Sequence, residues 1–359
     1  MKKWFFAAGM VLAFFFQRCT TDFDLNADYK ETPVIYALLS PNDTIHYIRI
    51  NRAFLSDETN AVTLAQDPNE IYYGDELTVV IEALSSGLVV DSYIVERVNG
   101  DTLGMPKNND GIFASAPNIL YRFKAPLVPF YSYKITVNNT ETGINAYAET
   151  PVIDTFKIKR PDDESIFPFA VTFSSFTPFQ FRWQSGQDAK FYDLSLRVHY
   201  RERIYHPEGD SFTTIGSGTV EWKYAQFYTA ESTTGGIILT YDLEGNRFYD
   251  FISDNFEPVD DFNYFRFADS IQFMVDAGGQ ALFEYIQFNN STLGLTEGQF
   301  TDTYTNVTGG LGVFSTRYHK EGKIYPFSAQ TVDSIACGVI SGGLNFATDN
   351  ANADFPYCD

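Results

Sequence analysis

Side chains that could bind a metal gather in one short stretch, HYRERIYHPEGD at residues 199–210. Histidine nitrogens and carboxylate oxygens are common zinc ligands in proteins. The stretch offers five such groups, on His199, Glu202, His206, Glu208 and Asp210. In an extended strand, however, His199 and His206 point to opposite faces, because an odd number of positions separates them. The pattern therefore favours a solvated strand end with paired charges over a metal site.

A second group of oxygen ligands occurs near the C-terminus, in DNANAD at residues 349–354. Asn350, Asn352 and Asp354 occupy every second position, as at the start of a calcium-binding loop. The glycine and glutamate that complete such a loop are missing from their places. We expect a polar loop here, and we predict no bound metal or cofactor for the protein.

Aromatic rings lie beside carboxylates in EPVDDFNYFRF at residues 257–267. Such rings can stack on sugars or anchor a protein partner. Phe262, Tyr264 and Phe265 are therefore candidate contacts for a partner or a glycan. A buried core strand is the simpler explanation of the same rings, and both interpretations stay open.

Motifs typical of catalytic and nucleotide-binding sites are missing from the sequence. It has no G-x-S-x-G, G-x-x-x-x-G-K-[ST], H-E-x-x-H or C-x-x-C pattern. The formal net charge of −21 opposes binding to nucleic acid, since phosphate neutralisation dominates that affinity. We expect a non-enzymatic protein that binds no nucleic acid.

The first residues have the pattern of an export leader. Two lysines precede WFFAAGMVLAFFF at residues 4–16, and Cys19 follows closely. A helix of this length would reach roughly 20 Å, which is shorter than a hydrocarbon core of about 30 Å. The segment therefore fits a signal peptide and not a membrane span.

This leader resembles a bacterial lipoprotein signal, in which the chain is cut before a cysteine that then carries acyl chains. The resemblance implies a signal peptide at residues 1–18, attachment of Cys19 to outer-membrane lipid, and an acidic tether at 19–32. Arg18 departs from the usual small residue before the cysteine. The alternatives are an ordinary secretory leader that is cut elsewhere and an anchor that is not cleaved.

Two further cysteines, Cys337 and Cys358, complete the set of three. If Cys19 is acylated, these two can pair in an oxidising compartment and tie down the C-terminal tail. We predict this disulfide, with two separate buried thiols as the alternative.

Apolar and polar residues alternate in many short segments, as in LTVVI at residues 77–81 and FQFRWQ at 179–184. Alternation between turn-forming clusters predicts half-buried antiparallel strands. The segment 131–152 resembles the last hairpin of an immunoglobulin-like domain, and 179–200 resembles two strands of a fibronectin type III domain. We predict a mainly β protein with two immunoglobulin-like β-sandwich domains, at residues 33–150 and 151–359.

The second domain is predicted to be enlarged with short helices and long loops. Phe248, Phe251 and Ile252 have helical spacing after Asn246, and residues 282–286 repeat it. A single helical turn is also expected at residues 60–66.

Four triplets, each beginning with Asp and Ser or Thr, resemble the O-glycosylation sites of exported Bacteroidota proteins. The resemblance implies sugar on some of Thr44, Thr102, Ser270 and Ser334.

The leader, the opening segment DFDLNADYKETPVIYALLSPNDTIHYIRINRAFL and the later GGLGVFS together resemble a Bacteroidota outer-membrane lipoprotein family with a domain of unknown function. The resemblance implies an outer-membrane location and a role beside a β-barrel partner. Asp22 and Asp24, soon after the cysteine, are similar to a short acidic export tag, which favours the cell surface over the periplasmic face. We therefore expect an accessory interaction module of an outer-membrane complex for transport, secretion or barrel assembly. The alternative is a glycan-binding surface lipoprotein.

Overall fold

The computed structural model describes residues 31–53, 60–108, 111–167, 169–209, 211–292, 304–348 and 358. The predicted signal peptide, Cys19, Asp210 and the polar loop at 349–354 lie outside these residues.

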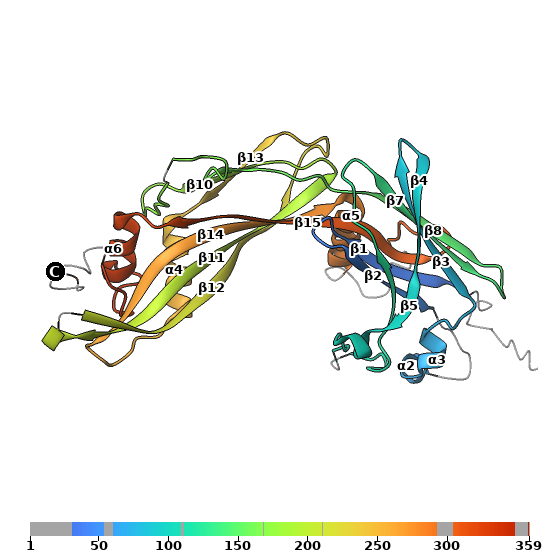
Figure 1. Ribbon diagram of the computed structural model, residues 1–359, viewed down its shortest axis with the longest axis horizontal. Coiled ribbons are helices and arrows are strands. Elements are labelled where there is room, and N and C mark those ends of the chain that lie inside the picture. The colour runs from blue at the N-terminus through green and yellow to red at the C-terminus, as the bar shows by residue number, and fades with distance from the viewer. Residues whose placement is uncertain are drawn as a thin grey trace, which may run out of the picture.

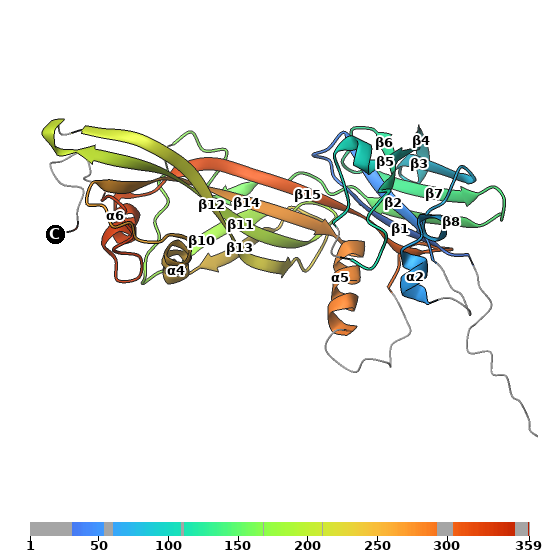
Figure 2. The same cartoon turned by 90° about the horizontal axis from the view of Figure 1, so that it is seen from below.

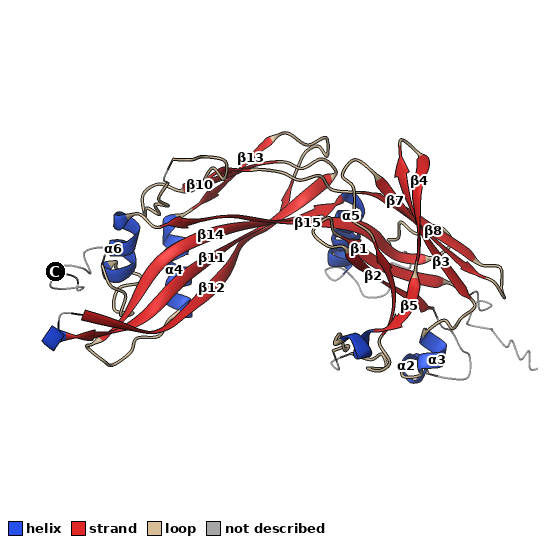
Figure 3. Cartoon of the chain, viewed as in Figure 1, coloured by secondary structure: helices blue, strands red, loops and turns tan. Residues whose placement is uncertain are grey.

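Strands dominate the described residues, so the predicted mainly β architecture is confirmed (Figure 3). The strands are β1 (Pro33–Leu39), β2 (Ile45–Arg52), β3 (Leu77–Ser85), β4 (Leu88–Ile94), β5 (Glu96–Asn99), β6 (Ile119–Lys124), β7 (Ser132–Asn139), β8 (Asn145–Pro151), β9 (Ile158–Arg160), β10 (Phe179–Gln184), β11 (Ala189–His206), β12 (Ser211–Thr229), β13 (Ile238–Leu243), β14 (Tyr264–Gly279) and β15 (Leu311–Pro326).

The helices are short, and they include those that the sequence predicted. They are α2 (Ala61–Ala65), α3 (Pro68–Ile71), α4 (Gly245–Asn255), α5 (Gln280–Thr292) and α6 (Ala329–Cys337), with 3-10 turns at Gly100–Leu103 and Pro207–Gly209. Asn60 begins α2 as expected of a capping residue, because its side chain accepts a hydrogen bond from the backbone N–H of Val62.

One long strand, β15, runs through both halves of the elongated molecule (Figure 1). Its first residues, 311–316, pair in parallel with β1, and residues 317–326 pair antiparallel with β14. The result is one eight-stranded sheet in the order β12-β11-β14-β15-β1-β2-β6-β5. Gly312 permits the close approach to β1, since its φ is +106° and a Cβ would overlap the carbonyl of Ile35.

The N-terminal lobe, which we define as β1–β8 with residues 304–316, consists of two facing layers. The strands β15-β1-β2-β6-β5 face a separate sheet in the order β4-β3-β7-β8, and side chains of both layers share one core. Val307 and Phe314 belong to this core, although they lie far beyond the predicted domain boundary at residue 150. A bridge between Tyr147 and Thr308 closes one side of the lobe, while β4 and β5 are edge strands on the other.

The C-terminal lobe, residues 152–292 and 317–348, packs one face of β12-β11-β14-β15 against the small sheet β13-β10-β9 and the helices α4 and α6. The opposite face carries ion pairs such as Arg197–Glu221 at 2.6 Å and Lys223–Asp193 at 3.2 Å. The helix α5 lies at the junction of the lobes (Figure 2), where Tyr285 contacts Tyr36 of β1 edge to face.

Candidate binding surfaces

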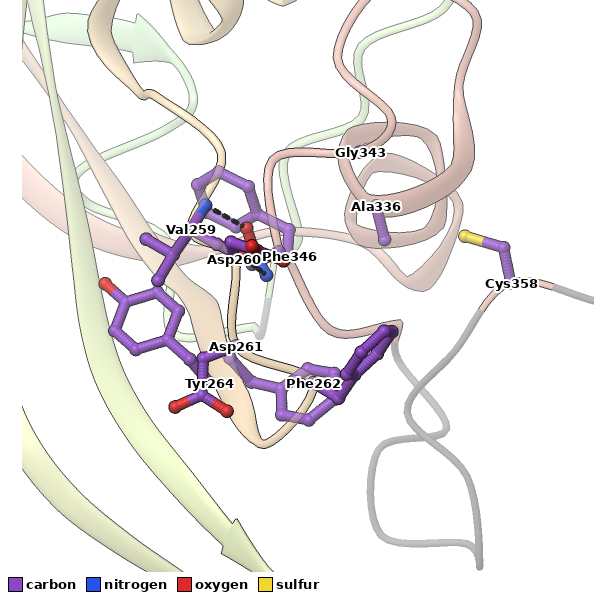
Figure 4. A pocket seen from close by; sticks show the side chains of 11 residues that line it. Val259, Asp260, Asp261, Phe262, Tyr264, Ala336, Gly343, Phe346 and Cys358 are labelled. Atoms are coloured by element: carbon purple, nitrogen blue, oxygen red, sulfur yellow. Dashed lines mark hydrogen bonds between the residues drawn. The ribbon is translucent and has the colours of Figure 1, made fainter.

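A pocket of about 340 Å³ lies at the end of the C-terminal lobe, between the loop after α4 and the segment after α6 (Figure 4). The lining side chains combine aromatic rings, carboxylates and one disulfide cysteine: Val259, Asp260, Asp261, Phe262, Tyr264, Phe265, Ala336, Gly343, Asn345, Phe346 and Cys358.

Hydrogen bonds hold the two walls of this pocket together. The side chain of Asn345 accepts from the backbone N–H of Val259 at 2.7 Å and donates to its carbonyl at 3.0 Å (Figure 4). The buried guanidinium of Arg266 donates to the carbonyls of Glu257 and Leu344, both at 2.8 Å. Because these bonds join backbone groups of the two walls, the shape of the pocket is set before any ligand arrives.

The three aromatic residues singled out in the sequence have different positions here. Phe262 lies at the rim of the pocket with 85% of its surface exposed, whereas Tyr264 and Phe265 are buried, as the core-strand interpretation predicted. The Tyr264 hydroxyl donates to Glu202. Burial, together with that carboxylate, raises the pKa of Tyr264 to about 12, so this hydroxyl is a fixed structural group at neutral pH. Phe262 is therefore the ring that can meet a ligand.

An exposed phenyl ring beside carboxylates can stack on an apolar sugar face while the carboxylates accept hydroxyl hydrogens. Asp260 and Asp261 are both exposed next to Phe262. Asp261 already accepts a bond from the backbone N–H of Asn263 at 2.8 Å, which leaves Asp260 better placed to receive a ligand hydroxyl.

The predicted disulfide between Cys337 and Cys358 is confirmed. It joins the end of α6 to a residue that lines the pocket, so α6 and the pocket wall are covalently linked.

The histidine-rich stretch forms the far end of the hairpin β11–β12. His199 and His206 lie in the same strand, and the His206 imidazole hydrogen-bonds to the Thr213 hydroxyl at 2.9 Å. Glu202 is engaged by Tyr264. Within the described ranges, no group of three or more His, Cys, Asp or Glu side chains is arranged to hold a metal ion. Asp210, Asn350, Asn352 and Asp354 are not among the described residues.

The four predicted glycosylation positions differ in exposure. Thr44 and Thr102 are exposed in a turn and a 3-10 turn, while Ser270 in β14 and Ser334 in α6 are half-buried. The Ser334 hydroxyl donates to the Gln330 carbonyl at 2.8 Å. Thr44 and Thr102 are thus the more accessible acceptors, and modification of all four stays a prediction.

A second surface, which the sequence did not reveal, follows the edge strand β4. Four apolar side chains are exposed along this short strand, Leu88 at 73%, Val89 at 54%, Val90 at 51% and Ile94 at 89%. A pocket of about 570 Å³ lies where β4 ends, lined by Ile45, Ser92, Tyr93, Ile94, Glu96, Arg122, Phe123 and Lys124. The pocket lies on the side of the N-terminal lobe where β4 and β5 are the edge strands.

Local sequence could indicate that residues 88–94 form a strand, but it could not show that the strand lies at an edge. The order β4-β3-β7-β8 depends on pairing with residues distant in the chain. The pocket of the C-terminal lobe escaped prediction for the same reason, because Val259 and Asn345 are 86 residues apart.

No helix in the described ranges combines the length and apolarity needed to cross a membrane. No protein-family model matches the chain, and no curated protein matches it.

Proposed function

We propose that the protein is a non-enzymatic lipoprotein of the outer-membrane surface, anchored through Cys19, and that its two immunoglobulin-like β-sandwich lobes form an interaction module beside a β-barrel complex. The two facing layers of the N-terminal lobe support the sandwich assignment. The exposed apolar edge strand β4 is the observation that carries the proposed binding role.

An edge strand presents unpaired backbone N–H and C=O groups, and soluble proteins usually protect such edges with charges, prolines or covering segments. β4 carries one exposed charge, Asp91, but it also exposes four apolar side chains, those of Leu88, Val89, Val90 and Ile94. The occupant that fits is an extended segment of an envelope protein, which adds one strand beside β4 and covers these side chains.

A positive charge at the end of β4 could also contribute to binding of the added strand. The Lys124 ammonium lines the pocket there and, among the described residues, has no carboxylate partner, whereas Arg122 is paired with Glu96 at 2.8 Å. An acidic side chain at the end of the added strand would meet Lys124.

Affinity purification from detergent-solubilised membranes tests the proposal. Wild-type protein should retain a stoichiometric barrel partner, and Val90→Asp with Ile94→Asp should abolish its recovery, since two charges would face an apolar strand. Ile215→Asp is the matched control, because Ile215 is also exposed on an edge strand, β12. Equal recovery with both variants would contradict the role of β4.

The anchor has its own test. Cys19→Ala should abolish acyl labelling and membrane retention, because a single modified cysteine is the proposed attachment. Retention of the unlabelled variant in the membrane fraction would refute the lipoprotein assignment.

A glycan-binding surface lipoprotein is the second candidate, favoured by the exposure of Phe262 beside Asp260. In that case the purified protein binds an immobilised polysaccharide without any partner. Phe262→Ala should then release it, and Phe176→Ala should not, since Phe176 is a similarly exposed ring outside the pocket.

A further inference from the structure

A third pocket, of about 360 Å³, lies on the outer face of β1 and β2 in the N-terminal lobe. Two cross-strand pairs form its floor, Val34 opposite Asn51 and Tyr36 opposite Arg49. The intervening Ile35 points the other way, into the core, where it is completely buried. The strand alternation that builds the core therefore also presents these four side chains outward.

Apolar side chains and cations complete the walls. Ile71 at the end of α3 and the half-exposed ring of Phe113 supply apolar surface, and Lys107 contributes an ammonium group. Asn51 contributes a buried side-chain oxygen that has no hydrogen-bond partner among the described residues. None of the described lining residues is acidic, although the chain as a whole has a net charge of −21.

Three cationic side chains line this pocket, and two of them, Arg49 and Lys107, have only neutral partners among the described residues. The Arg49 guanidinium donates to the Asn118 side-chain oxygen at 2.8 Å. The Lys107 ammonium donates to the Tyr72 hydroxyl at 3.1 Å and to the Ala114 carbonyl. Within the described part of the chain neither has a carboxylate partner, whereas Arg52, the third cation of the lining, is paired with Glu76 at 3.2 Å.

A partly buried cation whose hydrogen bonds go to neutral acceptors still attracts an anion, because hydrogen bonds between charged groups are stronger than those to neutral ones. The neighbouring apolar walls favour an apolar chain on the same ligand. We propose that this pocket binds an anionic amphiphile, with its head group at Arg49 and Lys107 and its chain against Tyr36, Ile71 and Phe113.

Calorimetric titration of the purified protein with three probes of equal chain length tests this proposal. Dodecanoate and dodecyl phosphate should bind, and dodecanol, which has no charge, should bind about tenfold more weakly or worse. Tighter binding of dodecanoate indicates a free fatty acid as the natural source, and tighter binding of dodecyl phosphate indicates a lipid phosphate.

Single substitutions assign the head-group site. Arg49→Gln and Lys107→Gln should each weaken dodecanoate binding about tenfold, and Arg49→Lys should restore part of the loss by restoring the charge. Lys124→Gln is the matched control, because it removes a cation of the same lobe outside this pocket. Equal affinity of the wild-type protein for dodecanol and dodecanoate would overturn the proposal whether or not the variants fold. Unchanged dodecanoate affinity in the folded Gln variants would also overturn it.

Discussion

The two lobes fill their cores with different side chains. About half of the buried residues in the C-terminal core are aromatic, and rings stack there directly, as Phe173 does on Phe248 with centroids 3.9 Å apart. In the N-terminal core only about a quarter are aromatic, and small aliphatic side chains of two sheets face each other. In the C-terminal core the rings pack both between its two sheets, as Phe181 does on Phe273, and beneath α4.

The lobes also differ in the chemistry of their pockets. The N-terminal pocket places Arg49 and Lys107 beside apolar walls, whereas the C-terminal pocket places Asp260 and Asp261 beside Phe262. Ligands of opposite charge preference would therefore be separated along one molecule. The shared strand β15 raises the question of whether the two lobes, despite these differences, unfold as one unit.

The largest effect is expected from Phe314→Ala in β15. Phe314 is completely buried in the N-terminal core, so its truncation should cost about 3–5 kcal/mol of unfolding free energy. The described tryptophans, Trp183 and Trp222, belong to the C-terminal lobe. If β15 couples the lobes, the urea midpoint measured by tryptophan fluorescence should fall in Phe314→Ala, although the substitution lies in the other lobe.

Phe273→Ala, in the C-terminal core, provides the comparison for this experiment. It should shift the same transition by a similar amount. A fluorescence midpoint that moves with Phe273→Ala and stays in place with Phe314→Ala would show that the lobes unfold separately.

An intermediate effect is expected from removing the disulfide. Changing Cys337 and Cys358 together to Ser should cost about 3 kcal/mol, because the bond closes a loop of moderate length in the unfolded chain. Urea unfolding should detect the loss. Reduction of the wild-type protein should reproduce it, and reduction of the double variant should have no further effect. An unchanged midpoint would mean that the tail contributes nothing to the C-terminal lobe.

The smallest effect on stability is expected from a change of pH, and it should act through His46 in the N-terminal lobe. Burial lowers the pKa of His46 below its usual 6.5, despite the opposing hydrogen bond to the Ala125 carbonyl. The unfolded chain therefore binds this proton more readily than the folded one. The contribution of neutral His46 to the free energy of unfolding should be fully present above pH 6.5. It should decline as the pH falls from there to the folded-state pKa.

Urea midpoints measured on both sides of this pH range provide the check. His46→Gln should flatten the dependence, and His206→Gln, which changes an exposed imidazole, should leave it as in the wild type. A pH dependence unchanged by His46→Gln would assign the effect to other groups.

Local patterns in the sequence predicted much of the fold. Alternation placed the strands around Val79 and Trp183, and helical spacing placed α4 and α5. Such patterns specify which face of an element is buried, but they carry no information on which strands become neighbours. The parallel pairing of β15 with β1 joins residues at opposite ends of the chain, so it could not be predicted from either segment.

The same distinction between local patterns and long-range contacts applies to the candidate sites. The sequence identified Phe262 because the aromatic and acidic residues of that loop are adjacent in the chain. It could not show that Asn345 holds the facing wall or that Arg49 and Lys107 line one pocket, because these residues come together only after folding. The disulfide was predictable because, once Cys19 is assigned to lipid, only one pairing remains.

The continuity of β15 has a mechanical consequence. A force that pulls the two lobes apart along the long axis cannot be absorbed by a hinge loop at this strand, because its backbone is bonded to β1 in one lobe and to β14 in the other. Separation requires shearing a row of hydrogen bonds in at least one sheet. The strand can therefore transmit tension directly from one lobe to the other.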